Sequence, residues 1–333
     1  MSKKWVLVSL TLALLTSGCS EAGSTALKSE TSNAPENNEV SVFEDNPNPV
    51  SLAALNKLDI SGSNLVLKNK VGTTNTYTKY EITYQANEFE ISGILNIPFG
   101  DGPFPALVMG HGYIDPAIYT TGRGLKREQD YLASNGFIVL HTDYRNHAGS
   151  DDDPNNTLNM RLGYTVDVIA AAKALRNSGL AQVDQKRIGY LGRSMGGGIG
   201  YNVATVAPNE FDALVLYAPV SANYVDNFNK WGRNNPEIEN PIVEKFGSPE
   251  DAPDFWKGIS AENYFANISD PIMIHHGTND ESCKVEWSQR AAAQMKAAGK
   301  DVTLHLYEGE AHAFGPMWEL SMQRSVEFLQ ANL

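Results

Sequence analysis

The chain reads RIGYLGRSMGGGIGYNVATV at residues 187–206. The apolar run Arg187–Leu191 predicts a short buried strand, and the segment Gly197–Val206 predicts a helix. Between them, residues 192–196 match the pattern G-x-S-x-G, which is a weak signal alone. Its position between a strand and a helix is typical of a tight turn that exposes Ser194 above the end of a strand. Glycines flank the serine because a Cβ atom there would clash with neighbouring backbone.

Outward from this stretch, apolar runs that predict strands alternate with helical patterns from residue 77 onward. The first two runs are expected to pair as a hairpin, and the later ones are continuous, as in strands buried on both faces. This order predicts an α/β fold with a mostly parallel sheet of about eight strands and helices on both faces. The expected strands are Lys79–Gln85, Phe89–Ile97, Phe104–Met109, Phe137–Thr142, Arg187–Leu191, Ala213–Tyr217, Ile272–His275 and Val302–Tyr307. The expected helices are Leu125–Asn135, Gly163–Asn177, Gly197–Val206, Trp287–Ala298 and Pro316–Leu329.

Residues 221–265 contain no clear strand and are unusually aromatic. We interpret them as a small helical insertion after the sixth strand, over the sheet edge where ligands bind. Most of their aromatic side chains are expected to pack inside the insertion. We assign Tyr224, Trp231 and Trp256, together with Arg193 of the G-x-S-x-G motif, to substrate binding.

Two downstream residues suit the activation of a serine. A serine hydroxyl is a poor nucleophile until a base removes its proton, and in this kind of fold the acid and the histidine follow the serine in that order. Asp280 and His312 each follow a predicted strand. Because loops at the carboxyl ends of parallel strands meet at one sheet edge, we expect Ser194, Asp280 and His312 to form a catalytic triad. Glu281 is the alternative acid.

Two backbone amides are expected to stabilise the oxyanion of the reaction. The N–H of Met195, directly after the serine, is the first. The second is expected from Tyr113 in the sequence His111-Gly112-Tyr113, which follows the third predicted strand. Whether Tyr113 contributes its N–H or its phenol stays open.

These motifs together resemble the α/β-hydrolase superfamily, in particular its prolyl oligopeptidase-like and dienelactone hydrolase-like branches. The resemblance extends over residues 77–333 and implies Ser194 as nucleophile, Asp280 as acid and His312 as base. Oligopeptidases have a large β-propeller before this fold, for which about 60 residues here are too few. We therefore expect a serine hydrolase that cleaves carboxylic esters. The alternatives are a peptidase or amidase for short peptides, and a surface lipoprotein that only binds.

The first residues predict export. Lys3 and Lys4 precede a short apolar run, which indicates a signal peptide at residues 1–18. The next residue, Cys19, resembles the lipidated cysteine of bacterial lipoproteins, although Thr16 stands where leucine is usual. Residues 19–50 then form a polar tether, and residues 51–333 form the hydrolase domain. The chain is expected at the membrane through a lipid anchor, in the periplasm or at the cell surface, or secreted if Cys19 is not lipidated.

Charge and motif content exclude several other classes. With 26 basic and 39 acidic residues the net charge is −13, which disfavours binding to nucleic acid or to an anionic membrane surface. No zinc, dinucleotide or phosphate-loop motif stands in a suitable context, so no cofactor and no metal are expected. The run Asp151–Asp153 is expected to be an exposed loop, with calcium binding as the alternative. The expected partner is therefore a small ester or short peptide.

Overall fold

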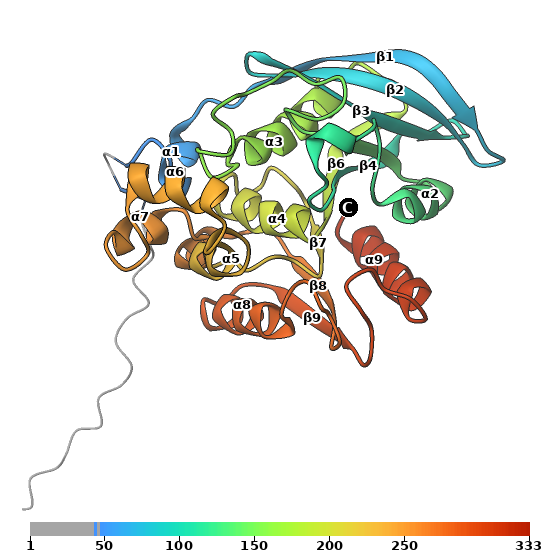
Figure 1. Cartoon of the computed structure of the whole chain (residues 1–333). Coiled ribbons are helices and arrows are strands. Elements are labelled where there is room, and N and C mark those ends of the chain that lie inside the picture. Colours follow the sequence, from blue (N-terminus) through green and yellow to red (C-terminus); the bar gives the residue numbers. More distant parts are fainter. Residues whose placement is uncertain (1–42, 45–46) are drawn as a thin grey trace, which may run out of the picture. The chain divides into compact units, whose positions relative to one another are not determined.

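One nine-stranded sheet organises the part of the chain that the computed structural model describes, residues 43–44 and 47–333 (Figure 1). The strand order is β1-β2-β3-β5-β4-β6-β7-β8-β9. The first three strands and the β3–β5 pair are antiparallel, and all pairs from β5 through β9 are parallel. The strands are β1 Gly62–Thr73, β2 Tyr77–Ala86, β3 Phe89–Pro98, β4 Phe104–Gly110, β5 Ile138–Thr142, β6 Val183–Arg193, β7 Leu214–Tyr217, β8 Ile272–Gly277 and β9 Val302–Tyr307.

Helices cover both faces of the sheet. Successive residues of a strand point to opposite faces, so Ala106 and Val108 of β4 pack into one apolar cluster and Leu107 and Met109 into the other. The first cluster includes residues of α3, α4 and α8, and the second includes residues of α2 and α9. The helices are α1 Leu52–Lys57, α2 Lys126–Ser134, α3 Gly163–Arg176, α4 Met195–Val206, α5 Tyr224–Asn227, α6 Pro236–Phe246, α7 Pro253–Gly258, α8 Val285–Ala297 and α9 Trp318–Asn332, with shorter turns η1 Pro116–Ile118, η2 Phe228–Gly232 and η3 Ala261–Asn267.

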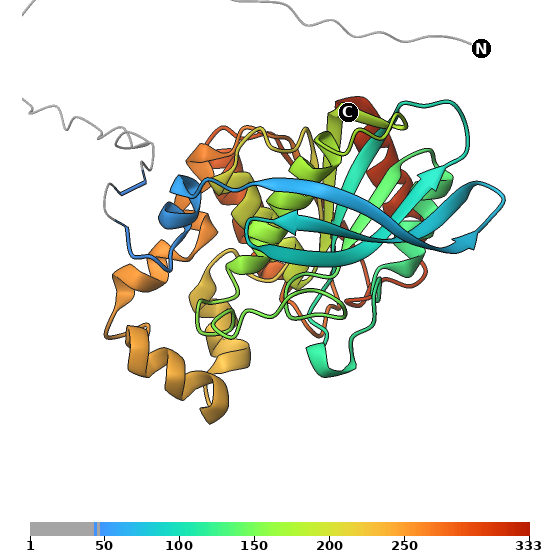
Figure 2. The ribbon, with the colours of Figure 1, turned by 90° about the horizontal axis from the view of Figure 1, so that it is seen from above.

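Residues 221–265 fold as the expected helical insertion between β7 and β8, made of α5, η2, α6, α7 and η3. Figures 1 and 2 show this orange segment at one end of the molecule, away from the tip of the β1–β2 hairpin. Its interior is aromatic: the rings of Phe246 and Phe255 stack at 4.1 Å, and Phe228 lies 4.6 Å from Trp256. Aromatic packing therefore accounts for most of the aromatic content that the sequence shows there.

The fold confirms the predicted α/β-hydrolase architecture with one correction. The sheet has nine strands rather than eight, because β1 precedes the first predicted strand. Most of β1 is exposed at the sheet edge, so its sequence GSNLVLKNKVGT lacks the apolar runs by which the other strands are predicted. The predicted signal peptide, Cys19 and most of the tether lie outside the described residues. Among the helices described, none is long and apolar enough to cross a membrane.

Candidate active site

Ser194 occupies a strained turn between β6 and α4. Its backbone has φ 59° and ψ −117°, a conformation that side-chain-bearing residues rarely adopt. Two neighbours hold it: the Ser194 N–H donates to the carbonyl of Tyr217 at 2.9 Å, and the Val220 N–H donates to the carbonyl of Ser194 at 3.1 Å. The turn therefore has the geometry of a nucleophile elbow.

Glycines let three segments meet beneath this turn. A Cβ atom on Gly192 would lie 2.3 Å from the carbonyl oxygen of Gly196, and one on Gly196 would lie 2.1 Å from that of Gly110. Both distances are far below a normal contact. The close approach of α4 to β4 and β6 consequently requires glycine at these positions.

Asp280 and His312 meet at the ends of β8 and β9. The Nδ1 atom of His312 lies 2.8 Å from Oδ2 of Asp280, whose side chain is fully buried, whereas that of His312 is 18% exposed. The two loops are also joined through their backbones, since the Asn279 N–H donates to the carbonyl of Glu310 at 3.0 Å. This pairing leaves Nε2 of His312 available to another group.

Asp280 is held as a carboxylate by several donors. Its Oδ1 atom accepts hydrogen bonds from the N–H groups of Ser282, at 2.8 Å, and Cys283, at 2.7 Å. Nε2 of His276 lies 3.3 Å from Oδ2. Burial alone would raise the pKa of Asp280, but the hydrogen bonds from His276, His312 and Cys283 hold it well below the ordinary value. The group that orients His312 is thus negatively charged at neutral pH.

The alternative acid, Glu281, contacts the backbone instead. Its Oε2 atom accepts the N–H of His312 at 3.2 Å, while Asp280 contacts the ring. Glu310, two residues before His312, is buried, and its carboxylate accepts the N–H groups of Gly315 and Met317. The Glu310 carboxylate therefore braces this loop.

Cys283 lies between the serine and the acid, a placement that the sequence analysis missed. Its Sγ atom is 4.0 Å from Oγ of Ser194, and its N–H donates to Asp280. Burial, followed by the charge of Asp280, raises the pKa of this thiol to about 12. Because the thiol stays neutral, Cys283 is a packing group here rather than a nucleophile. No local motif marks it, since its contact with Ser194 joins residues that are far apart in the sequence.

The loop after β4 lies directly beside the serine. A Cβ atom on Gly112 would stand 3.2 Å from Cβ of Ser194. The ring of His111 is buried, and its Nδ1 atom lies 2.6 Å from the carbonyl oxygen of Gly112. Met195 is the first residue of α4, so its N–H has no acceptor within the helix. Both candidate oxyanion segments, at Tyr113 and Met195, therefore adjoin Ser194.

The residues predicted to bind substrate have different surroundings. Trp256 is 1% exposed and its Nε1 donates to the carbonyl of Gly247, so the expectation that it faces a substrate is wrong. Its flat ring instead fills the interior of the insertion. Nη1 of Arg193 lies 3.4 Å from Glu128. The hydroxyl of Tyr224 donates to a backbone carbonyl.

Trp231, by contrast, is 42% exposed and lies 5.8 Å from Trp287. Nζ of Lys230 lies over both rings and 3.5 Å from the carbonyl oxygen of Glu281, the neighbour of Asp280. Of the assigned aromatic residues, Trp231 therefore offers the most exposed ring near the loop of the acid.

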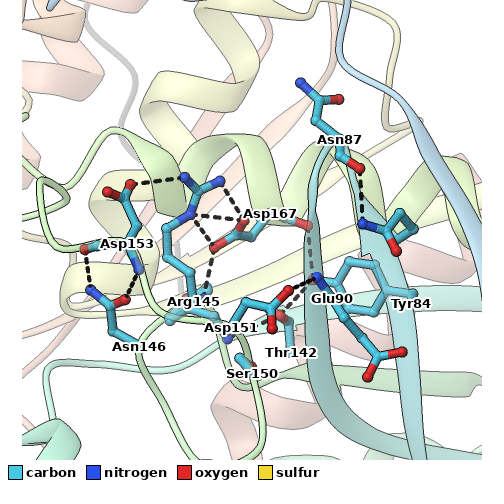
Figure 3. A network of polar contacts seen from close by, with 12 residues as sticks. Tyr84, Asn87, Glu90, Thr142, Arg145, Asn146, Ser150, Asp151, Asp153 and Asp167 are labelled. Atoms are coloured by element: carbon cyan, nitrogen blue, oxygen red, sulfur yellow. Dashed lines mark hydrogen bonds and ion pairs between the residues drawn. The ribbon is translucent and has the colours of Figure 1, made fainter.

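The loop 143–162 is held by a polar network centred on Arg145 (Figure 3). The guanidinium lies between Asp167, at 2.8 Å, and Asp153, at 3.1 Å. Asp151 accepts the N–H of Glu90 at 2.7 Å. The acidic run is an exposed loop, as predicted, and two of its carboxylates also fasten the loop 143–162. Across the described residues, no cluster of acidic, histidine or cysteine side chains could hold a metal ion.

The sequence model of the prolyl oligopeptidase family matches residues 124–333, a range that includes Ser194, Asp280 and His312. The chain belongs to this family. Membership confirms the predicted superfamily and agrees with the prediction of a serine hydrolase.

Individual relatives of this family member include both peptidases and esterases. The chain is 25% identical over 231 residues to the uncharacterized peptidase YuxL of Bacillus subtilis, covering 66% of this chain and 30% of the relative. It is 27% identical over 222 residues to esterase EstD of Thermotoga maritima, covering 60% of this chain and 52% of EstD. The chain thus spans about half or less of these two relatives. An acetyl xylan esterase from Paenibacillus sp. R4 has the same fold, with a TM-score of 0.65 and 19% identity. The match covers 85% of this chain and 92% of the esterase.

Proposed function

We propose that this protein is an exported serine hydrolase that cleaves carboxylic esters through an acyl-enzyme intermediate. The observation that supports it most strongly is the 2.8 Å contact between Asp280 and His312, at the sheet edge where the strained turn presents Ser194. A buried carboxylate fixed to Nδ1 orients the imidazole and stabilises its protonated form. Nε2 is then the atom that takes the proton of the serine.

The reaction follows from this arrangement. Oγ of Ser194 attacks the ester carbonyl carbon while Nε2 of His312 accepts its proton. The N–H groups of Met195 and Tyr113 stabilise the oxyanion, and the positive end of α4 supports the negative charge. His312 returns the proton to the departing alcohol, and then activates a water molecule that releases the acid and restores Ser194. Asp280 stays ionised throughout.

An ester is the first choice of substrate, and a short peptide is the second. EstD, at 27% identity, supports the ester, and the family model supports the peptide. Both reactions use the same attack and the same oxyanion, and they differ in how much protonation the leaving group needs. Relative rates on matched ester and anilide substrates therefore decide between them.

The direct test is hydrolysis of 4-nitrophenyl acetate and butyrate and of an aminoacyl 4-nitroanilide series, with labelling by a fluorophosphonate probe. We expect turnover of the esters, labelling of the unaltered protein, and neither in Ser194→Ala, with a loss of at least about 10⁴-fold. Ser282→Ala, a serine on the same rim, is the matched control and should keep its label. An unlabelled and inactive parent protein would favour the binding lipoprotein instead.

Export through a lipid at Cys19 is part of the proposal. Its support is the basic and apolar sequence before that cysteine. Cells grown with a clickable fatty acid should label the unaltered protein but not Cys19→Ala. Cys283→Ala is the control, because the buried thiol should not be acylated. Equal labelling of the parent and Cys19→Ala would contradict the lipid anchor.

A further inference from the structure

Unlike most inward-lying arginines of the described chain, Arg161 has no carboxylate partner, a feature it shares with Arg324, whose guanidinium lies over the ring of Tyr307. Arg145 pairs with Asp167, and Arg193 pairs with Glu128. Arg161 is half-buried, and its guanidinium contacts an aromatic ring instead. The chain has 39 acidic residues for 26 basic ones, so a shortage of carboxylates is not the reason.

The ring in contact with Arg161 is that of Tyr113. The guanidinium carbon lies 4.8 Å from the ring centroid, and Tyr113 is 57% exposed. A guanidinium stacked on a ring keeps its N–H groups, which lie in its plane, free for an anion. The pair therefore combines a fixed positive charge with unused donors at the surface.

The backbone at Arg161 is held in an unusual conformation. Met160 and Arg161 both adopt left-handed conformations, with φ 57° and 56°, which is unfavourable for residues other than glycine. The Arg161 N–H donates to the carbonyl of Asn156 at 2.7 Å, and the hydroxyl of Tyr224 donates to that of Met160 at 3.0 Å. The insertion and the loop 143–162 thus hold an energetically unfavourable conformation that presents the charge.

The loop that contacts Arg161 also adjoins the candidate catalytic serine. Tyr113 follows Gly112, and a Cβ atom on Gly112 would be 3.2 Å from Cβ of Ser194. The same loop that is expected to bind the oxyanion therefore also supports Arg161.

We propose that Arg161, stacked on Tyr113, is a specificity-determining residue that binds a carboxylate of the substrate, so that the enzyme prefers esters with a free carboxylate. This inference rests on the proposed esterase function. A charge-assisted bidentate contact in a half-buried position discriminates strongly against a neutral analogue. The surrounding chain is acidic, so this preference depends on a local cation rather than on overall attraction.

Two matched substrate pairs test the inference. Monomethyl adipate and dimethyl adipate place the charge in the acyl part, and 4-acetoxybenzoate and 4-acetoxybenzamide place it in the leaving group. We expect Arg161→Gln to lower kcat/KM for the charged member of at least one pair by about 10- to 100-fold, and to leave the neutral members within about twofold. Arg161→Lys should retain part of the preference, and added salt should reduce it.

Arg187→Gln is the matched control, because it removes the same charge from a half-exposed position on β6, where Arg187 pairs with Asp184. An equal loss for charged and neutral esters, or an unchanged preference, would overturn the inference, with thermal melting used to verify that each variant is folded. If the parent protein cleaves no ester, the proposed function fails separately. Calorimetry of 4-acetoxybenzoate against Ser194→Ala, with and without Arg161→Gln, then still measures the subsite: binding lost with the arginine supports it, and equal binding overturns it.

Discussion

The two sides of the candidate active site are built differently. On one side, the loops after β8 and β9 are short and tied together, with Asp280 receiving backbone and imidazole donors at 2.7 to 3.3 Å. On the other side, the loop 143–162 and the insertion are long; the first carries Arg161, which contacts the ring of Tyr113, and the second carries the exposed Trp231. The groups proposed for chemistry are therefore held rigidly by contacts within two adjacent loops. The groups proposed for selectivity depend instead on segments that are distant from one another in the sequence.

The largest expected effect lies on the first side. Asp280→Asn should reduce kcat by about 10⁴-fold with little change in KM, because an amide neither holds the productive tautomer of His312 nor stabilises its charge. The measurement is steady-state hydrolysis of 4-nitrophenyl butyrate. Glu281→Gln is the control, since Glu281 contacts only the backbone of His312, and it should stay within about tenfold of the parent. If Glu281→Gln were the more damaging change, the assignment of the acid would be reversed.

The next largest effect is a difference in stability between variants of two tryptophans in the insertion. Trp256→Ala should lower the free energy of unfolding by about 3 to 5 kcal/mol, because it empties a large buried site. Trp231→Ala, at an exposed position, should cost less than about 1 kcal/mol and act mainly on KM for aromatic esters. Urea denaturation of both variants measures the difference. Similar losses of stability would show that the insertion does not have the interior described for it.

A smaller effect concerns His141, which is buried near the oxyanion loop, its ring 5.5 Å from that of His111. Burial, with the charge of His111 as the next cause, holds the pKa of His141 well below 6.5. The unfolded chain therefore binds the extra proton as the pH falls below about 6.5, and stability decreases there.

Between pH 6 and 5 the parent protein should lose about 1 kcal/mol more of its unfolding free energy than His141→Phe. The measurement is urea denaturation at both pH values. Between pH 8 and 9 the two proteins should change in parallel, which is the control. An equal loss in the acid range would mean that the imidazole is not kept neutral by burial.

Much of the core and the proposed triad could be predicted from the sequence, because short stretches of sequence mark both. Continuous apolar runs marked the buried strands, and Asp280 and His312 each follow such a run directly. The strand β1 was not predicted, because an exposed edge strand with polar residues lacks a continuous apolar run. Arg161 and Cys283 were not singled out from the sequence. Arg161 contacts Tyr113 and Cys283 contacts Ser194, and only folding brings these residues together.

The position of Trp256 could not be read from sequence for a related reason. An aromatic residue in an insertion packs inward or faces a ligand according to which neighbours fold over it, and composition does not distinguish the two. Its burial beside Phe228 and Phe255 resulted from the arrangement of three short helical segments. The same composition also gave the exposed Trp231.

The glycine crossing beneath Ser194 has a practical consequence for protein engineering. Where backbone presses on backbone at Gly192 and Gly196, no repacking of side chains makes room for a larger residue, and at Gly110 an added Cβ atom would meet the buried hydroxyls of Tyr190 and Tyr144. Saturation libraries aimed at new substrates should therefore leave these codons untouched. Diversity is better directed to residues 156–161 and 224–231, where altered shape changes what enters without disturbing the platform that positions the hydroxyl.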